Sequence, residues 1–128
     1  MKKFIVVTGG AGFVGSNLIE LLIKKTKYNI LSLDNYSSGS KRNHINSKRL
    51  KYIKGNTIDI SKKLYLYKKK IVCLFHFGEF ARIYQSFRNF DKCFESNLTG
   101  TNEVFKFCLN NRTKLIYSAT SASLGNKG

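Results

Sequence analysis

The sequence has no proline, only three cysteines among its 128 residues, and no apolar run that approaches the length of a membrane span. The cysteines (Cys73, Cys93 and Cys108) are odd in number and lack a close paired spacing, which argues against a disulfide framework and against a cysteine-bound metal. We therefore expect reduced thiols, a cytoplasmic location, no membrane association and no metal site. Repeats, low-complexity tracts and linkers are also absent, so one domain at most is predicted.

Acidic residues are scarce, since seven Asp and Glu stand against 23 Lys and Arg, which gives a formal net charge of +16. A basic balance of this size can indicate a nucleic-acid partner. The lysines are, however, dispersed over two loop-like stretches, 41–54 and 62–70, and over helix faces. We interpret this as a bias of the whole sequence that produces a solvated basic surface. Such a surface is compatible with anionic nucleotide ligands, and no nucleic-acid partner is expected.

Short apolar runs alternate with helical patterns along the chain. Strands are expected at 3–8, 29–34, 50–54, 71–76 and 114–118, with a loop over 35–47. Helices are expected at 13–25, near 61–67 and over 87–110. This alternation predicts an α/β fold, a Rossmann-type doubly wound parallel sheet that stops after about five strands.

A stripe of large apolar side chains marks the expected helix over 87–110. Such a stripe is more typical of a core or a subunit interface than of a ligand contact. Its members are Phe87, Phe90, Phe94, Leu98, Phe105, Cys108 and Leu109.

The most informative segment begins with the apolar run Phe4 to Val7, which breaks into glycines and is followed by apolar residues at helical spacing from Leu18 to Ile23. A buried strand, a glycine turn and a helix in this order open a dinucleotide-binding βαβ unit. Glycine permits the tight turn, lets backbone approach a diphosphate, and lets helix and strand pack closely. Amide N–H groups at the helix start would face the phosphates. The residues expected to bind there are Gly9, Gly12, Phe13, Val14 and Gly15.

Asp34 ends the second expected strand, 19 residues after Gly15. A carboxylate at this place accepts hydrogen bonds from the adenosine ribose hydroxyls and repels a 2′-phosphate, so it favours NAD over NADP. The alternative is an Asp that caps its own turn. Lys41 and Arg42 are the residues that keep NADP open.

The segment Thr8 to Gly15, with the spacing Thr-Gly-x-x-Gly-Phe-x-Gly, resembles the opening of the extended short-chain dehydrogenase/reductases. The chain is most similar to their NAD-dependent epimerase/dehydratase family, because the segment Asp34 to Lys41 resembles the ribose-binding loop of UDP-glucose 4-epimerase-like enzymes. The resemblance implies that 1–128 is an incomplete NAD-binding Rossmann domain and that the C-terminal substrate domain is absent. It also implies cofactor contacts at Asn35, Ser38 and Gly39.

Further cofactor contacts are implied by the same resemblance after the later strands. Asn56 stands where the family usually has an Asp that contacts the adenine amino group, and its amide oxygen can still accept from that amine. Glu79 stands where the family often has a small residue, and the nearby His76 is expected to be packed rather than catalytic. The implied contacts are Asn56, Thr57, Phe77, Gly78, Glu79, Asn97 and Ser118.

The last segment with a counterpart in the family runs from Ile116 to Gly125. Thr120 stands where the family has the hydroxyl that hydrogen-bonds the reacting sugar, so the resemblance implies a catalytic role for it. Dehydratases of the family carry an Asp-Glu pair directly afterwards, whereas this chain has Ser121 and Ala122, which favours the epimerases. The family's Tyr-x-x-x-Lys does not occur in a plausible place, so the chain as given is expected to lack turnover.

The resemblance therefore implies the NAD-binding part of a nucleotide-sugar 4-epimerase, which acts by transient hydride transfer to bound NAD. A 4,6-dehydratase or a reductase of the same family is an alternative, and so is a non-catalytic NAD-binding module. A nucleotide-sugar is the implied substrate of the intact protein. A homodimer through the helix over 87–110 is the implied assembly.

Overall fold

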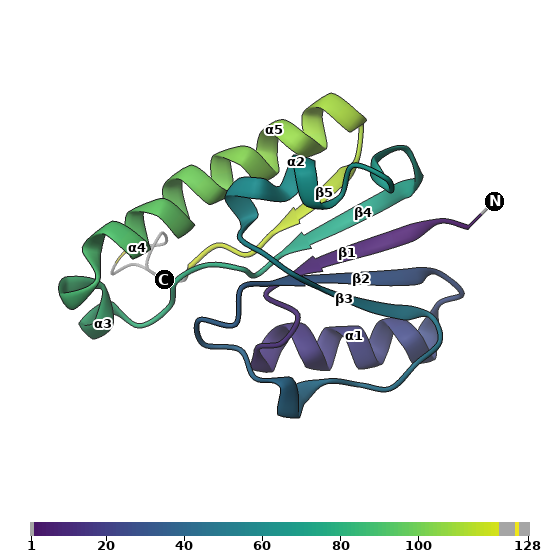
Figure 1. The fold of residues 1–128 in the computed structure, drawn as a ribbon, viewed down its shortest axis with the longest axis horizontal. Coiled ribbons are helices and arrows are strands. Elements are labelled where there is room, and N and C mark those ends of the chain that lie inside the picture. Colours follow the sequence, from purple (N-terminus) through teal and green to yellow (C-terminus); the bar gives the residue numbers. More distant parts are fainter. Residues whose placement is uncertain (1, 121–124, 126–128) are drawn as a thin grey trace.

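The computed structural model describes residues 2–120 and 125, and its strands form a single parallel sheet (Figure 1). The strand order is β3-β2-β1-β4-β5, so the first strand lies in the middle and the winding reverses between β1 and β4. The predicted Rossmann-type fold is confirmed. The strands are β1 (Phe4–Thr8), β2 (Asn29–Asp34), β3 (Leu50–Lys54), β4 (Ile71–His76) and β5 (Lys114–Tyr117).

Helices cover both faces of the sheet. Helix α1 (Phe13–Lys25) lies on one face, and α2 (Ile60–Lys63) and α5 (Thr101–Asn111) lie on the other (Figure 1). The apolar run of β1 is nearly continuous because its residues are buried on both faces in turn. The bounds of α1 agree with the prediction, and those of β1 and β5 differ from it by one residue each.

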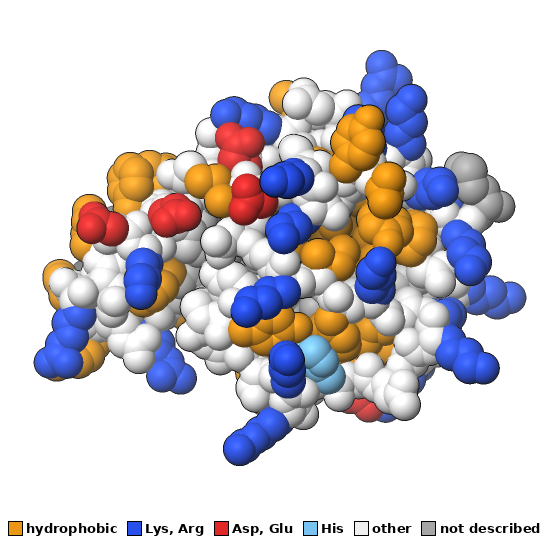
Figure 2. All heavy atoms as spheres, in the orientation of Figure 1, with side chains coloured by type: hydrophobic (Ala, Val, Ile, Leu, Met, Phe, Trp, Pro, Cys, Tyr) orange, Lys and Arg blue, Asp and Glu red, His pale blue; other side chains and the backbone are white. Residues whose placement is uncertain are grey.

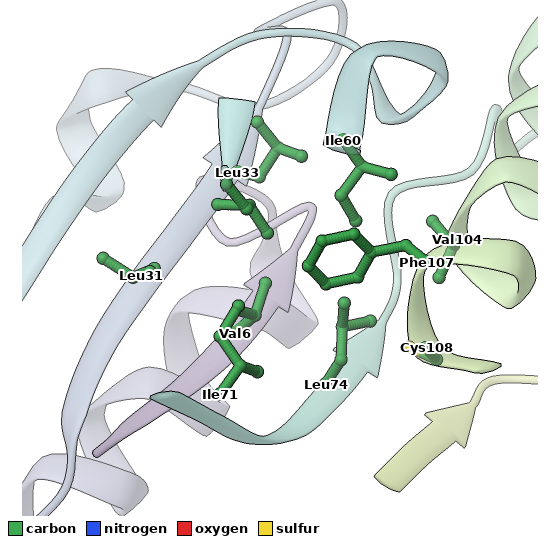
Figure 3. Packing of buried hydrophobic residues seen from close by; sticks show 10 residues of the cluster. Val6, Leu31, Leu33, Ile60, Ile71, Leu74, Val104, Phe107 and Cys108 are labelled. Atoms are coloured by element: carbon green, nitrogen blue, oxygen red, sulfur yellow. The ribbon is translucent and has the colours of Figure 1, made fainter. Parts of the chain in front are cut away.

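The side chains of β1 alternate between two cores. Val6 packs with the cluster beneath α2 and α5, whereas Ile5 and Val7 pack with the cluster beneath α1. Phe107 reaches from α5 toward the strands and lies near Leu74 (Figure 3). Full burial of a ring of this size contributes about 2–3 kcal/mol. The two cores hold the sheet between its helices and so fix the positions of the strand ends.

The expected helix over 87–110 is wrong as a single element. Helix α3 (Ile83–Arg88) is followed by Asn89, whose backbone leaves the helical region with φ −133° and ψ 45°. Helix α4 (Phe90–Phe94) then continues through the π-helical turn Glu95–Gly100 into α5. The wider turn lies where Gly100 meets the buried Thr57, since a Cβ on that glycine would lie 2.2 Å from the threonine Oγ1. An amphipathic pattern does not report such a local break.

Two smaller segments also depart from the prediction. The helix expected near 61–67 is only Ile60–Lys63, preceded by a 3₁₀ turn over Thr57–Asp59. The expected loop over 35–47 contains a 3₁₀ turn, Lys41–Asn43, which begins at the hydroxyl of Ser40.

The apolar stripe over 87–110 does not form a core in this chain. Cys108 is its one buried member, and Phe87 is 81% exposed. The core alternative is therefore wrong, and the interface alternative stays a prediction. The exposed members are Phe87, Phe90, Phe94, Leu98, Phe105 and Leu109.

The carboxyl ends of β1 and β4 are joined by a buried polar contact. The Thr8 hydroxyl accepts the backbone N–H groups of Phe77 (3.1 Å) and Gly78 (3.0 Å) and lies 2.6 Å from His76 Nδ1. Because this hydroxyl already accepts two hydrogen bonds, its own hydrogen goes to Nδ1. The imidazole therefore carries its proton on Nε2, which donates to Thr101 Oγ1 at 3.0 Å. The prediction that His76 is a packed, hydrogen-bonded residue is confirmed.

We predict that His76 makes the fold sensitive to acid. Burial lowers the pKa of His76 from 6.5 to about 4 in the folded chain, so protonation favours the unfolded state. This contribution to the free energy of unfolding, roughly 3 kcal/mol, is complete above about pH 6.5 and is lost as the pH falls toward 4. Urea unfolding between pH 7 and 4.5 measures it. His76→Gln should flatten the pH dependence while lowering stability at pH 7.

The matched control is His44→Gln, which removes the other imidazole of the chain. A pH dependence that is as steep in His76→Gln as in the parent chain would contradict the prediction.

We also predict that Gly15→Ala destabilises the fold. A Cβ at this position would lie 2.2 Å from the Gly9 carbonyl oxygen and 2.8 Å from the Gly10 Cα, and neither backbone atom can yield cheaply. We expect a loss of roughly 1–3 kcal/mol in urea unfolding. The comparison is Gly12→Ala, whose Cβ would meet one atom, the Gly9 oxygen, at 3.2 Å. Equal losses in both variants would refute the steric argument.

Candidate functional site

A cavity of about 390 Å³ opens at the carboxyl ends of the strands, where the winding reverses between β1 and β4. Open α/β sheets bind ligands at this place. Loops that follow the first four strands build the walls, together with part of the segment around α4. The lining residues that the sequence predicted are Gly9, Gly12, Asp34, Asn35, Ser38, Gly39, Asn56, Thr57, Phe77, Gly78 and Glu79.

The glycine turn after β1 folds back on itself at the floor of this cavity. Gly9 has φ +70°, and its N–H donates to the Leu33 carbonyl at 2.9 Å. A Cβ on Gly9 would lie 2.8 Å from the carbonyl carbon of Phe77, so the turn touches the loop after β4 directly. Gly12 is the N-cap residue of α1, and no side chain in the described part of the chain caps the helix at this end. The first N–H groups of this helix are thus available to an anionic ligand.

Asp34 is nearly buried, and both of its oxygens accept backbone hydrogen bonds. Oδ2 accepts from Ala11 N at 2.9 Å, and Oδ1 accepts from Tyr36 N at 2.8 Å. The second bond stabilises a turn in which Tyr36 has a left-handed φ of 62°. Asp34 therefore does cap its own turn, as the alternative expected, and it also lines the cavity. A carboxylate has about four acceptor positions, so two remain for hydroxyls of a ligand.

The loops after β2 and β3 are joined by two amide side chains. Asn35 Nδ2 donates to Asn56 Oδ1 at 2.8 Å, and Asn35 Oδ1 accepts from Ser37 N at 2.9 Å. The Asn56 oxygen thus shares its two lone pairs between Asn35 and any amine of a ligand. Together these residues form the wall of the cavity on the β2 and β3 side.

Glu79 lies on the opposite wall, after β4. Its Oε1 accepts hydrogen bonds from the Thr101 hydroxyl at 3.1 Å and from the Tyr117 hydroxyl at 2.9 Å. The Tyr117 ring also stacks on His76, with centroids 5.9 Å apart. The hydrogen bond to Glu79 raises the pKa of Tyr117, so its hydroxyl stays protonated and remains a donor. Two hydroxyl partners thus accommodate the Glu79 carboxylate at a position where the sequence resemblance implies a small residue.

Several predicted site residues do not line the cavity. Phe13 and Val14 are 82% and 57% exposed at the start of α1, and Gly15 is buried beneath the turn. Asn97 supports the wall instead, because its amide binds both the N–H (2.5 Å) and the carbonyl (2.9 Å) of Phe80. Ser118 is exposed after β5.

The segment expected to orient the substrate is described only in part. Thr120 is exposed and does not line the cavity, and residues 121–124 lie outside the described residues. The roles of these positions stay predictions.

Other lining residues were not predicted from the sequence. Some are direct neighbours of predicted positions, so the motifs indicated the correct loops but not each member. Lys92, Glu95 and Ser96 come from the interrupted helical segment, and no motif indicated which of its residues face the cavity. The remaining members are Leu33, Ser37, Gly55, Ile58 and Phe80.

The chain is similar to sugar-nucleotide enzymes in sequence. It is 33% identical over 128 residues to a dTDP-D-glucose 4,6-dehydratase of Dictyostelium discoideum, a match that covers 94% of this chain and 30% of that protein. It is 28% identical to the UDP-glucose 4-epimerase of Drosophila melanogaster, with 94% and 38% covered. The chain thus spans about a third of the length of the curated relatives it matches.

Solved structures that are similar to the chain also include epimerases. An epimerase of Methanothermobacter thermautotrophicus superposes with a TM-score of 0.86 at 29% identity, over 94% of this chain and 36% of that one. A UDP-N-acetylglucosamine 4-epimerase of Methanobrevibacter ruminantium has a TM-score of 0.82 at 34% identity, over 98% and 40%. The UDP-glucose 4-epimerase of Brucella ovis, solved in complex with NAD, has a TM-score of 0.80 at 27% identity, over 96% and 37%.

The family resemblance read from the sequence is therefore confirmed. Residues 5–128 match the NAD dependent epimerase/dehydratase family. This range includes the glycine turn, the Asp34 loop and the whole sheet apart from Phe4. The chain belongs to the NAD dependent epimerase/dehydratase family.

Proposed function

We propose that this chain is the NAD-binding part of a nucleotide-sugar epimerase, with the cofactor in the cavity at the strand ends. The observation that carries the proposal is the glycine turn at the floor of the cavity beside the carboxylate of Asp34. Side-chain-free backbone, uncapped helix N–H groups and an acceptor for ribose hydroxyls are the parts that a dinucleotide needs. The residues that line the cavity therefore fit NAD.

In this proposal each part of the cofactor contacts a different set of residues. The N–H groups of Phe13, Val14 and Gly15 would hold the diphosphate, although the side chains of Phe13 and Val14 do not line the cavity. Gly12 would contribute its lack of a side chain, since its own N–H donates to the Gly9 carbonyl at 3.1 Å. Asp34, with the loop of Asn35, Ser38 and Gly39, would hold the adenosine ribose. Asn56 and Thr57 would meet the adenine. Phe77, Gly78 and Glu79 would line the half of the cavity that holds the nicotinamide nucleotide. Asn97 would act on that wall through its hydrogen bonds to Phe80, and Ser118 would contribute from the segment after β5.

The chemistry follows from the cofactor, since NAD accepts a hydride from a sugar carbon and returns it. Thr120 would orient the reacting hydroxyl of a nucleotide-sugar. The absence of an Asp-Glu pair at residues 121–122 favours a 4-epimerase. A 4,6-dehydratase or a reductase remains an alternative, and the similarity to the Dictyostelium dehydratase supports keeping it. A non-catalytic NAD-binding module is the second alternative. The chain lacks a well-placed Tyr-x-x-x-Lys, so we expect no turnover from it alone.

Surface features support proposals on the oligomeric state, the partners and the location of the protein. The exposed apolar stripe around α4 and α5 supports a homodimer interface. Lys and Arg are spread over the visible face and do not gather on one element (Figure 2), which supports the absence of a nucleic-acid partner. Among the described residues no helix has the length and apolar character to span a bilayer. We propose a cytoplasmic protein that acts on nucleotide-sugars.

We predict that the chain binds NAD and that Gly12→Val weakens this binding at least about tenfold, because the added side chain would occupy the space of the diphosphate. Gly12 has an ordinary φ of −82°, and its added Cβ would meet only the Gly9 oxygen, so the fold should persist. Isothermal titration calorimetry measures the affinity, and circular dichroism checks the fold. The control is Leu21→Val, at an exposed residue of α1 that does not line the cavity. Absence of NAD binding in the folded parent chain would refute the proposed function.

We predict that the chain prefers NAD to NADP by about tenfold or more, because a 2′-phosphate would stand against the Asp34 carboxylate. The same calorimetric titration with both cofactors measures the ratio. Lys41→Ala and Arg42→Ala test the cations that keep NADP open, and because neither side chain lines the cavity, each should change the ratio by less than about twofold. Equal affinity of the parent chain for the two cofactors would contradict the prediction.

A further inference from the structure

The cavity is acidic although the chain is strongly basic. Of seven acidic residues in the whole chain, three (Asp34, Glu79 and Glu95) line this one cavity, and Lys92 is the one basic residue among its described lining. Asp34 lies on the β2 side, whereas Glu79 and Glu95 come from the β4 side and the helical segment beside it. The negative charge of the β4 side is the feature that the dinucleotide motifs do not account for.

Glu79 is held in place by neutral partners. Thr101 and Tyr117 both donate to Oε1, and Thr101 is in turn fixed by the buried His76. No described residue donates a hydrogen bond to Oε2. The Glu79 side chain is 27% exposed, so it is partly withdrawn from water.

No cation neutralises this carboxylate among the described residues. His76 Nε2 lies 4.0 Å away, but burial lowers the pKa of His76 to about 4, so the imidazole is neutral at pH 7. Lys92 lines the same cavity but forms no described ion pair with Glu79. Glu79 therefore presents a full negative charge at a fixed place on the wall.

This inference rests on the proposed function. With the adenosine ribose at Asp34 and the diphosphate at the glycine turn, the β4 wall is the part of the cavity left for the nicotinamide nucleotide. The oxidised and reduced cofactors differ by one hydride, and so by one positive charge on the nicotinamide ring. We propose that Glu79 makes the cavity favour the oxidised, cationic cofactor over the reduced, neutral one. A carboxylate fixed nearby attracts the cationic ring and gives the neutral ring no such stabilisation.

The experiment measures dissociation constants of the chain for NAD⁺, NADH and ADP-ribose by calorimetry at pH 7.5. The parent chain should bind NAD⁺ more tightly than NADH. Glu79→Gln removes the charge and keeps an acceptor for Thr101 and Tyr117, so it should lower the ratio Kd(NADH)/Kd(NAD⁺) roughly three- to tenfold. ADP-ribose lacks the nicotinamide, and its Kd should change by less than about twofold.

Two further variants separate charge from structure. Glu79→Asp keeps the charge and should retain most of the ratio. Glu103→Gln removes a carboxylate that pairs with Lys106 at 2.8 Å outside the cavity, and it should leave the ratio unchanged. Circular dichroism establishes the fold of each variant.

The outcomes are distinct. A parent ratio at or below one overturns the proposal even if every Glu79 variant fails to fold. A ratio that Glu79→Gln leaves unchanged, or an equal weakening of all three ligands, overturns it while the proposed function stands. If the folded parent chain binds none of the three ligands, the proposed function falls and this inference falls with it.

Discussion

The fold depends on the contact of backbone against backbone between the glycine turn and the loop after β4. Gly9 lies so close to Phe77 that a Cβ would overlap its carbonyl group, and Gly15 lies closer still to Gly9. Thr8 secures the same junction, because its hydroxyl accepts the N–H groups of Phe77 and Gly78. A side chain at Gly9 would push the turn after β1 away from the loop after β4, and one at Gly15 would push α1 away from that turn. Both Gly9 and the loop after β4 line the cavity, so this junction forms part of its wall.

The carboxylates of Asp34 and Glu79, on opposite walls of the cavity, are oriented in the same way. Asp34 and Glu79 each accept two hydrogen bonds from the protein itself before any ligand is present. Asp34 is held by backbone N–H groups, whereas Glu79 is held by the hydroxyls of Thr101 and Tyr117, of which the first also accepts a hydrogen bond from the buried His76. The orientation of both groups is therefore fixed on folding, and a ligand that meets them does not have to order their side chains.

The sequence predicted what depends on local patterns. The strands and α1 agree with their apolar runs, and the glycine spacing located the floor of the cavity. The interrupted helix was missed because an amphipathic pattern continues through Asn89 and the π-helical turn alike. The partners of Glu79 could not be predicted either, since Tyr117 lies 38 residues away and meets it only through the pairing of β4 with β5. Contacts of this kind are properties of the assembled sheet.

The exposed apolar stripe around α4 and α5 stands on a chain of net charge +16, and these two features oppose each other in solution. Apolar side chains favour self-association, whereas like charge on every copy repels an approaching neighbour. Dissolved salt shortens the reach of that repulsion to about 8 Å at physiological ionic strength and leaves the apolar attraction intact. We therefore expect ionic strength to govern the colloidal behaviour of the chain, with dilute buffer keeping the copies dispersed and added electrolyte letting them associate.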